Sequence, residues 1–187
     1  MDEHYLVMMT RNGMIKRTPY SEFANLRKSG LIAITLKEDD ELRAVNLTDG
    51  SMSMIIASRL GRSLRFHESA IRVIGRTGMG VHAMRLKEGD ELIDMSMLLE
   101  GQQVLAITTN GYGKRTDPDQ YREQGSNGMG IRAMNLTEKT GELADKAFDG
   151  LAKGATLLGE IGSKASGALS DLIGGNKNQN NDKEGNE

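Results

Sequence analysis

Regularly spaced basic side chains are the feature of this sequence that could do chemistry. Pairs of cations recur about every fifty residues, at Lys16 and Arg17, Arg62 and Arg65, and Lys114 and Arg115. A second set follows in the loop after each pair, at Arg27 and Lys28, Arg72 and Arg76, and Arg122. If these cations share one surface, they can neutralise phosphates and release counterions without reading base sequence. The alternative interpretation is a set of solubilising charges paired with nearby acidic residues, each contributing little free energy.

The remaining candidate motifs do not indicate a catalytic, nucleotide or metal site. The three histidines lie far apart, and the acidic turns at 38–41 and 88–91 lack the alternating Asp and Asn ligands of a calcium loop. Gly-x-Gly pairs occur at 78–80, 111–113 and 128–130, without the Lys of a phosphate-binding loop. We therefore expect no cofactor, no metal and no catalytic residue in this chain, and we interpret the acidic turns as solvated.

Charge and composition limit the function classes. The net charge is −2, and residues 1–144 contain 19 basic and 19 acidic residues, so DNA binding would require positive charge to be concentrated on one surface. The chain has no Cys, which excludes disulfides and thiolate metal sites. It has no stretch of about 20 apolar residues and no secretory signal at its N-terminus. These features predict a cytoplasmic protein without a membrane span.

The chain repeats itself three times. Gly30, Gly80 and Gly130 are spaced by 50 residues, and so are two other triplets, Ala33, Ala83 and Ala133, and Leu36, Leu86 and Leu136. Such a period indicates one structural unit used several times, each unit burying its apolar face against the next. Repeat arrays of this kind present surfaces for binding.

Each copy is predicted to contain four short strands. Apolar runs at 5–10, 54–58 and 104–109 predict the first strand, and the Asn-Gly or Leu-Gly turns that follow predict a hairpin to strands at 14–18, 62–66 and 112–116. A third strand follows each repeated glycine, and a fourth is predicted at 42–47 and 92–97. In the third copy the fourth strand should begin near Leu143, and the pattern stops at Ala144. Four strands per period are typical of propeller blades.

Beyond residue 144 the pattern becomes that of a glycine-rich amphipathic helix over 145–175. Apolar residues such as Phe148, Leu151, Ala155 and Leu158 follow helical spacing, while five glycines interrupt it. This segment could cover a blade edge, pair with another copy, lie on a membrane surface or have little fixed structure. Residues 176–187 are polar and predict a disordered tail.

Several motifs, in order along the chain, resemble the C-terminal domain of the DNA gyrase A protein. They are Asn12-Gly-Met-Ile-Lys-Arg-Thr-Pro19, Leu31-Ile-Ala-Ile-Thr-Leu-Lys-Glu-Asp-Asp-Glu-Leu42 with Leu47-Thr-Asp-Gly50, Arg65-Phe-His-Glu-Ser69 with Gly75-Arg-Thr-Gly-Met-Gly80, and Gly111-Tyr-Gly-Lys-Arg-Thr116 with Tyr121-Arg122 and Leu136-Thr-Glu-Lys-Thr-Gly141. The resemblance covers roughly residues 3–144. It implies a β-pinwheel, a propeller-like disc of four-stranded blades that exchange strands and wrap DNA on a basic outer rim.

Within that resemblance, the three copies (about 3–50, 51–100 and 101–144) are similar to the middle blades of a domain that usually has about six. No segment resembles the family's breakage-reunion or ATPase domain. The segment Gln124-Gly-Ser-Asn-Gly-Met-Gly130 stands where a sequence similar to the family's basic wrapping box can occur, but it lacks the basic residues. We therefore expect an all-β, partial β-pinwheel over 1–144, followed by the helical tail.

The resulting hypothesis is a non-catalytic module that binds double-stranded DNA through the phosphate backbone and assists supercoiling by a type II topoisomerase. Its contact residues would be the eleven cations of the repeated second strands and following loops. One alternative is a regulatory protein that pairs with gyrase subunits or with itself through exposed blade edges. A truncated gene product without function is the other.

Overall fold

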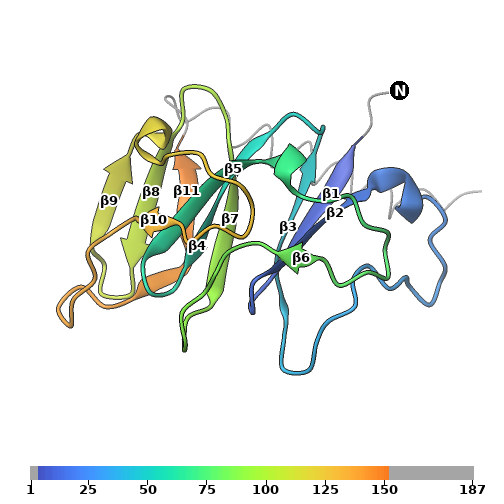
Figure 1. Cartoon of the computed structure of the whole chain (residues 1–187), viewed down its shortest axis with the longest axis horizontal. Helices are drawn as coiled ribbons and strands as arrows, with labels where there is room; N and C mark the ends of the chain where they lie inside the picture. Colours follow the sequence, from blue (N-terminus) through green and yellow to red (C-terminus); the bar gives the residue numbers. More distant parts are fainter. Residues whose placement is uncertain (1–3, 152–187) are drawn as a thin grey trace, which may run out of the picture. The chain divides into compact units, whose positions relative to one another are not determined.

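The computed structural model describes residues 4–151, which form three antiparallel β-sheets and three short 3-10 helices, with no α-helix in this range (Figure 1). One sheet belongs chiefly to each sequence repeat. The predicted all-β fold, a partial β-pinwheel of about three blades, is confirmed for this part of the chain.

In the first repeat, strands β1 (Tyr5–Thr10) and β2 (Met14–Pro19) form a hairpin, and β3 (Leu42–Thr48) pairs with the other side of β1. The hairpin turn contains Gly13, whose φ of +92° is a conformation that residues with a Cβ rarely adopt. Helix η1 (Tyr20–Phe23) follows β2. The hairpin predicted from the Asn-Gly turn is therefore present.

The other two repeats follow the same order. The second contains β4 (Ser53–Ser58), β5 (Arg62–His67), η2 (Glu68–Ala70), β6 (Val81–His82) and β7 (Leu92–Leu98). The third contains β8 (Gln103–Thr108), β9 (Gly113–Thr116), η3 (Pro118–Gln120), β10 (Ile131–Arg132) and β11 (Leu143–Leu151). β4 and β8 occupy the place of β1, with the second strand on one side and the fourth on the other.

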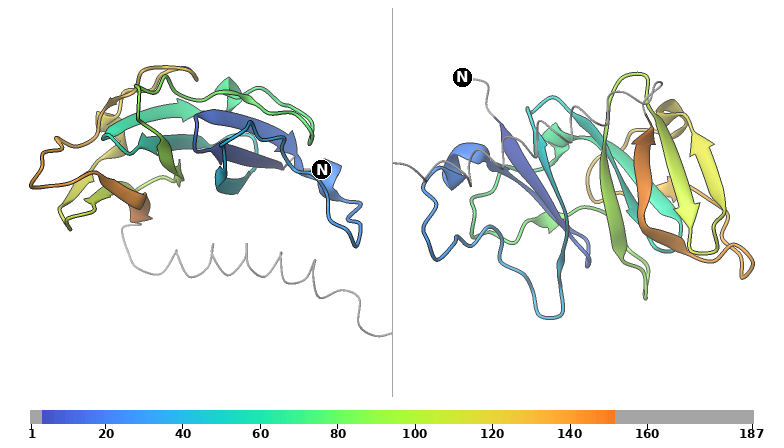
Figure 2. Two further views of the ribbon diagram at one scale, coloured as in Figure 1. Left: turned by 90° about the horizontal axis from the view of Figure 1, so that it is seen from below. Right: turned by 180° about the vertical axis from the view of Figure 1, so that it is seen from behind.

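Neighbouring repeats exchange their third strands. β6 of the second repeat pairs with β2 of the first, and β10 of the third pairs with β5 of the second. The sheet orders are therefore β3-β1-β2-β6 and β10-β5-β4-β7, whereas the last sheet, β11-β8-β9, has three strands. The exchanged strands β6 and β10 lie on the face seen in Figure 1, and the fourth strands lie on the opposite face, seen from behind in Figure 2.

We call residues 21–36, 71–86 and 121–136 the crossover segments, because the last two carry the chain to the preceding repeat. Parallel bridges from Arg17 to Val73 and from Arg65 to Glu123 place the beginning of these two segments beside β2 and β5. The first crossover segment contains most of helix η1 but no strand, although its sequence matches the other two segments. Its third strand, predicted after Gly30, is therefore absent from the described structure.

The hydrophobic core consists of two clusters, each lying between consecutive repeats. One joins Val7 and Met9 of β1 to residues of the second repeat such as Phe66 and Met95. The other joins Ile55 of β4 to residues of the third repeat, including Val104. The repeats thus bury their apolar faces against one another, as the period predicts.

The fourth strand of the third repeat corrects the sequence analysis. We expected it to be lost at Ala144, but β11 continues to Leu151 and pairs with β8, opposing Phe148 to Ala106. A register shift between Leu143 and Phe148 absorbs the residues that break the alternation, because backbone pairing tolerates a bulge. Residues 145–151 are therefore strand rather than helix. The remaining predicted helix and the polar tail lie outside the described residues.

Candidate nucleic-acid interface

The second-strand cations do not project into solvent in the first two repeats. Lys16 is fully buried, and its Nζ donates hydrogen bonds to the carbonyl oxygens of Gly75 at 3.0 Å and Arg76 at 2.5 Å. Both acceptors belong to the crossover segment of the next repeat. This position conflicts with the predicted role of Lys16 as a phosphate contact, because its ammonium group already binds two carbonyls at the joint between two repeats.

Burial gives Lys16 an unusual titration. Desolvation lowers the pKa of Lys16 from 10.5 to about 8, Glu22 opposes that shift, and Arg76 adds to it. Between these two pH values the unfolded chain binds the proton that the folded protein has released, so the free energy of unfolding rises with pH.

We therefore expect stability to increase by roughly 2 kcal/mol from pH 8 to pH 10, at about 1.4 kcal/mol per pKa unit of difference. The variant Lys16→Met should lose this rise. Urea unfolding followed by circular dichroism at several pH values measures it. An equal slope in both proteins would contradict the assignment to Lys16.

The arginines of β2 and β5 also join repeats. The Arg17 guanidinium lies 4.5 Å from the centre of the Tyr5 ring, and its Nη1 lies 3.5 Å from the carboxylate of the buried Glu68. The Arg65 Nη1 donates to the Pro118 carbonyl at 2.7 Å and lies 3.1 Å from Asp119. These side chains hold the helices η2 and η3 of the following repeats.

Arg62 and Arg76 are half-buried and bind backbone carbonyls. The Arg62 Nε donates to Met129 at 2.7 Å and its Nη2 to Gly130 at 2.9 Å, at the start of β10. Arg76 Nη1 donates to Ile32 at 3.3 Å. Like Arg17 and Arg65, these residues have structural partners, which direct one or two of the five N–H donors of each guanidinium to a neighbouring repeat. Their predicted phosphate contacts therefore compete with these structural roles.

The other six predicted cations are exposed, namely Arg27, Lys28, Arg72, Lys114, Arg115 and Arg122. Four of them lie on crossover segments, and two lie on β9. Arg72 and Arg122 occupy equivalent positions two residues after the ends of η2 and η3, and neither side chain is hydrogen-bonded or ion-paired to another residue of 4–144. Such side chains are free to contact an external anion.

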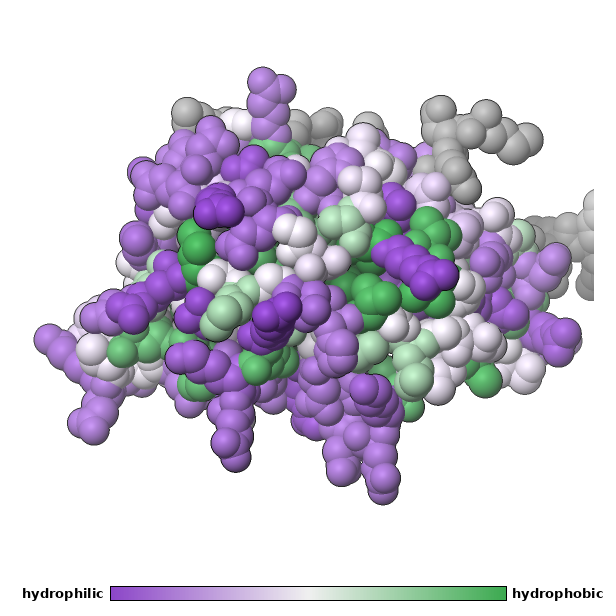
Figure 3. Space-filling view, in the orientation of Figure 1, coloured by the Kyte–Doolittle hydropathy of each residue, from purple (hydrophilic) through white to green (hydrophobic). Residues whose placement is uncertain are grey.

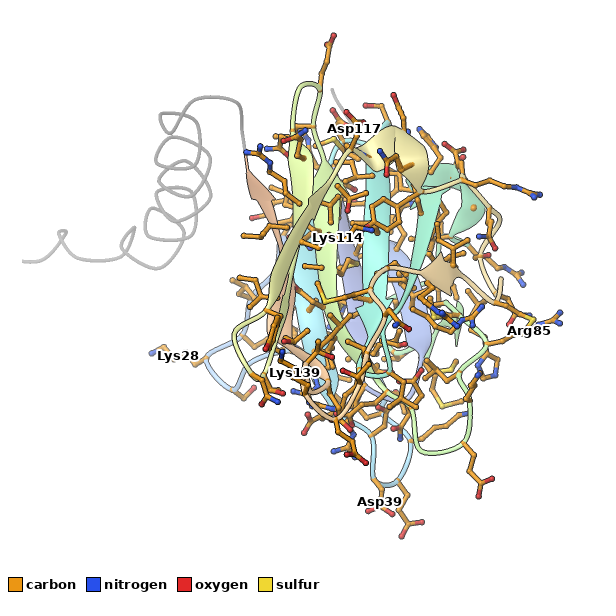
Figure 4. The ribbon with its side chains drawn as sticks, turned by 90° about the vertical axis from the view of Figure 1, so that its left-hand side faces the viewer. Lys28, Asp39, Arg85, Lys114, Asp117 and Lys139 are labelled. Carbon is orange, nitrogen blue, oxygen red and sulfur yellow. The ribbon has the colours of Figure 1, made fainter. Side chains whose placement is uncertain are left out.

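Sequence reasoning missed two exposed arginines of the crossover segments, Arg85 and Arg132. Arg132 follows Ile131 in β10, and Arg85 stands just beyond β6, projecting away from the body of the protein in Figure 4. A usable signal was present, because Arg132 alternates with the buried Ala133 on the third strand and should therefore face outward.

Positive charge is concentrated on the crossover segments. Residues 71–86 contain three arginines and no acidic residue, and the segments 21–36 and 121–136 each contain two cations and one Glu. Their combined net charge is +5, although residues 1–144 are neutral as a whole. The face that carries segments 71–86 and 121–136 is largely hydrophilic, with smaller apolar patches between projecting side chains (Figure 3). The net positive charge thus lies on the segments between the second and fourth strands of the repeats, as DNA binding through these segments would require.

The acidic turns have a structural role at the other ends of the strands. Glu91 accepts from Arg59 at 2.6 Å and lies 3.6 Å from Arg43 and 3.8 Å from Arg11. Arg59 also reaches Glu142 of the third repeat at 4.0 Å. This ladder links consecutive repeats and compensates the acidic charge. Within residues 4–151 no three His, Asp or Glu side chains are grouped as metal ligands.

Lys114 and Arg115 are exposed for a different reason from the crossover arginines. They are the equivalents of Lys16 and Arg17 on β9, and no crossover segment among the described residues covers that strand (Figure 4). Their exposure therefore reflects the side of the sheet β11-β8-β9 that no described strand covers. In the described part of the chain, no helix is long and apolar enough to span a membrane.

Comparisons with known proteins agree with this architecture. The family model described as "DNA gyrase C-terminal domain, beta-propeller" matches residues 4–49, 53–98 and 102–145. The DNA gyrase A protein of Halalkalibacterium halodurans is 50% identical over 80 residues, and that of Haloquadratum walsbyi is 44% identical over 81 residues. Each match covers 43% of this chain and 10% of the relative.

Two solved structures are similar over most of the chain. The C-terminal domain of DNA topoisomerase IV has a TM-score of 0.74 at 26% identity, covering 81% of this chain and 47% of that one. The DNA gyrase A C-terminal domain has a TM-score of 0.69 at 26% identity, covering 82% of this chain and 50% of that one. This chain thus spans about half of the solved domains, and its match to each gyrase protein covers about a tenth of that protein.

Proposed function

This chain belongs to the DNA gyrase C-terminal β-propeller family, and from that premise we propose that it binds double-stranded DNA through the phosphate backbone. The observation that carries the proposal is the net charge of +5 on the crossover segments. The contact residues are the exposed cations of those segments, which are Arg27, Lys28, Arg72, Arg85, Arg122 and Arg132.

The chemistry of these residues suits phosphate rather than base recognition. The guanidinium group of Arg carries donors in a planar fork that matches the oxygens of a phosphate. The arginines stand on short β-edges and loops, and the described residues contain no α-helix that could enter the major groove. Contacts with the backbone alone carry no sequence information, so the binding is independent of base sequence.

In a complete type II topoisomerase of the gyrase kind, this module would be a non-catalytic contributor to supercoiling. It would hold a stretch of duplex against the crossover segments, so that the rest of the enzyme receives DNA in a fixed path. The proposal needs no cofactor, because phosphate binding by fixed cations involves no chemical step.

A filter-binding titration with long duplex DNA tests the proposal. If about five or six phosphates are neutralised, the logarithm of the binding constant should fall with the logarithm of salt concentration with a slope of about −5. Affinity should then drop roughly a thousandfold between about 50 and 200 mM salt. Two duplexes of equal length and unrelated sequence should bind alike. Absence of binding at low salt, or an affinity that does not depend on salt concentration, would contradict the proposal.

A second candidate function is association with the other polypeptides of a gyrase-type enzyme. The observation that favours it is the outer edge of β9, which pairs with no strand among residues 4–151, since such an edge accepts a strand from another chain. Co-purification of this chain with a full-length gyrase A protein tests it. The variant Arg115→Pro is expected to abolish the interaction, because residue 115 alternates with residues 112 and 114 that pair with β8, so its N–H faces the open edge of β9, and Pro cannot donate to a β-ladder. An undiminished interaction of this variant would contradict pairing at β9.

A further inference from the structure

The two ends of the repeat row are complementary. Each inner joint is made when the crossover segment of one repeat adds a strand to the preceding sheet, as β6 does for β2 and β10 for β5. At one end, β9 is an acceptor strand that lacks such a neighbour within residues 4–151. At the other end, residues 30–36 are the equivalent of β6 and β10 without an acceptor.

The backbone groups of residues 30–36 and β9 correspond to those that are hydrogen-bonded at the two inner joints. Ala83 N–H donates to the Gly13 carbonyl at 2.8 Å, and Ala133 N–H donates to the Gly61 carbonyl at 2.9 Å. The equivalent bond in the next joint would join Ala33 to Gly111. Within residues 4–151 neither of these two groups makes the corresponding bond.

The side chains of the acceptor strand β9 also correspond to those of β2. Lys16 and Thr18 of β2 bind carbonyls of the next crossover segment, and the Thr18 hydroxyl donates to Ile74 at 2.7 Å. Their equivalents on β9 are Lys114, which is exposed, and Thr116, which has no such carbonyl acceptor among residues 4–151. By repeat position, Lys114 would reach the carbonyls of Asn25 and Leu26, as Lys16 reaches those of Gly75 and Arg76.

Apolar residues are uncovered at both ends. Leu92 and Leu143 at the start of their fourth strands are fully buried in the joint with the preceding repeat, whereas the equivalent Leu42 is 40% exposed. On the acceptor side, Met9 and Ala57 are fully buried by the next repeat, while their equivalent Ile107 is 38% exposed. The two ends thus carry the two halves of one joint, and the apolar side chains Leu42 and Ile107 that would be buried there are partly exposed.

We propose that a second copy of this chain fills both ends, its residues 30–36 adding a strand to β9 of the first. The surface is heterologous, and a head-to-tail contact closes into a ring when the rotation per protomer permits. Two copies have about the length of one solved relative, since this chain covers 47% and 50% of those domains. Two chains therefore supply about as many aligned residues as one solved domain.

This assembly is independent of the proposed DNA binding. It removes Lys114 from solvent, as Lys16 is removed now, but it does not cover Arg72, Arg85 or Arg122, which lie on inner crossover segments. Failure of either proposal leaves the other intact, because one is measured by mass and the other by DNA affinity.

The glycines supply a matched test. A Cβ at Gly80 would lie 2.5 Å from the Ile15 carbonyl oxygen, and a Cβ at Gly130 would lie 2.6 Å from that of Ser63, whereas at Gly30 nothing lies within 4 Å. By repeat position, the Gly113 carbonyl of a second copy would occupy that space. Gly30→Ala should therefore leave the single chain folded and block assembly.

Gly89→Ala is the control, because Gly89 has a φ of +75°, close to the +80° of Gly30, and also has open space around its Cα. By light scattering at concentrations up to about 200 μM, the native chain of 20.4 kDa and the Gly89→Ala variant should approach twice the mass of one chain. Gly30→Ala should weaken association at least tenfold. A native chain that stays monomeric throughout, or equal association by both variants, would overturn the proposal.

Disulfide trapping fixes the orientation, and the chain has no native Cys. In the two inner joints Met14 lies opposite His82, and Arg62 lies opposite Arg132. At the equivalent positions of the proposed joint, Tyr112 of one copy lies opposite Ile32 of the other. Such a pair is a non-hydrogen-bonded one, in which the two Cα atoms are about 4.5 Å apart, and this spacing lies within the range that a disulfide spans. A mixture of Ile32→Cys and Tyr112→Cys chains should give a covalent dimer, and each variant alone should not. Dimers without this mixed disulfide would contradict donation of residues 30–36 to β9.

Discussion

Reversing the charge of Arg72, Arg85 and Arg122 to Glu is expected to lower the affinity for duplex DNA by about a hundredfold or more at about 0.1 M salt. All three side chains are exposed and lie on crossover segments. Each lost contact removes one counterion-release increment, and each new carboxylate repels the phosphates. Because none of these three side chains is hydrogen-bonded or ion-paired to another described residue, the fold should be unaffected.

The matched control reverses Lys37, Lys87 and Lys139, which are also exposed but lie on or next to the turns that precede the fourth strands. This variant has the same total charge, so any general effect of net charge is identical in both. We expect its affinity to fall by roughly tenfold at most, since distant charges are screened beyond about 10 Å at 0.1 M salt. Filter binding compares the two variants, with circular dichroism as the folding check. Equal losses would contradict a localised surface.

The repeat, its hairpins and its strands were predictable from the sequence because each depends on local signals. A turn such as Asn12-Gly13 specifies its hairpin by itself, and alternation places Ala83 and Ala133 inside. Strand exchange leaves no local signal in the segments that meet. That the Lys16 ammonium would meet two carbonyls some sixty residues away could not be inferred from its neighbours.

One comparison between repeats did contain the information about Lys16. Its equivalent in the second repeat is Leu64, which is fully buried, so the position itself is an inward one. A comparison of each cation with the residues at the equivalent positions of the other repeats would have separated the buried cations from the exposed ones. By the same test, Arg72 and Arg122 form a pair of exposed equivalents, and they remain in the proposed DNA surface. The continuation of β11 was missed because a bulge interrupts the alternation that sequence reasoning relies on.

The exchange joint itself predicts the largest loss of stability. Gly80 has a φ of +104°, and a Cβ there would lie 2.5 Å from the Ile15 carbonyl oxygen, a backbone atom of β2. Gly80→Ala should therefore lose about 1–3 kcal/mol from backbone strain, and more from moving β6 off β2. We expect about 3–5 kcal/mol in total, at the upper end of single substitutions.

Gly89→Ala separates the two causes, because it imposes a similar strain at a φ of +75° with nothing within 4 Å. It should lose about 1 kcal/mol, measured for both variants by urea unfolding with circular dichroism, since the chain has no Trp. Gly80→Ala should also weaken DNA binding, because the same joint holds Arg72 and Arg85 in place on their segment. If the two variants lose equal stability, the close approach at Gly80 contributes nothing, and strand exchange is not what joins the first two repeats.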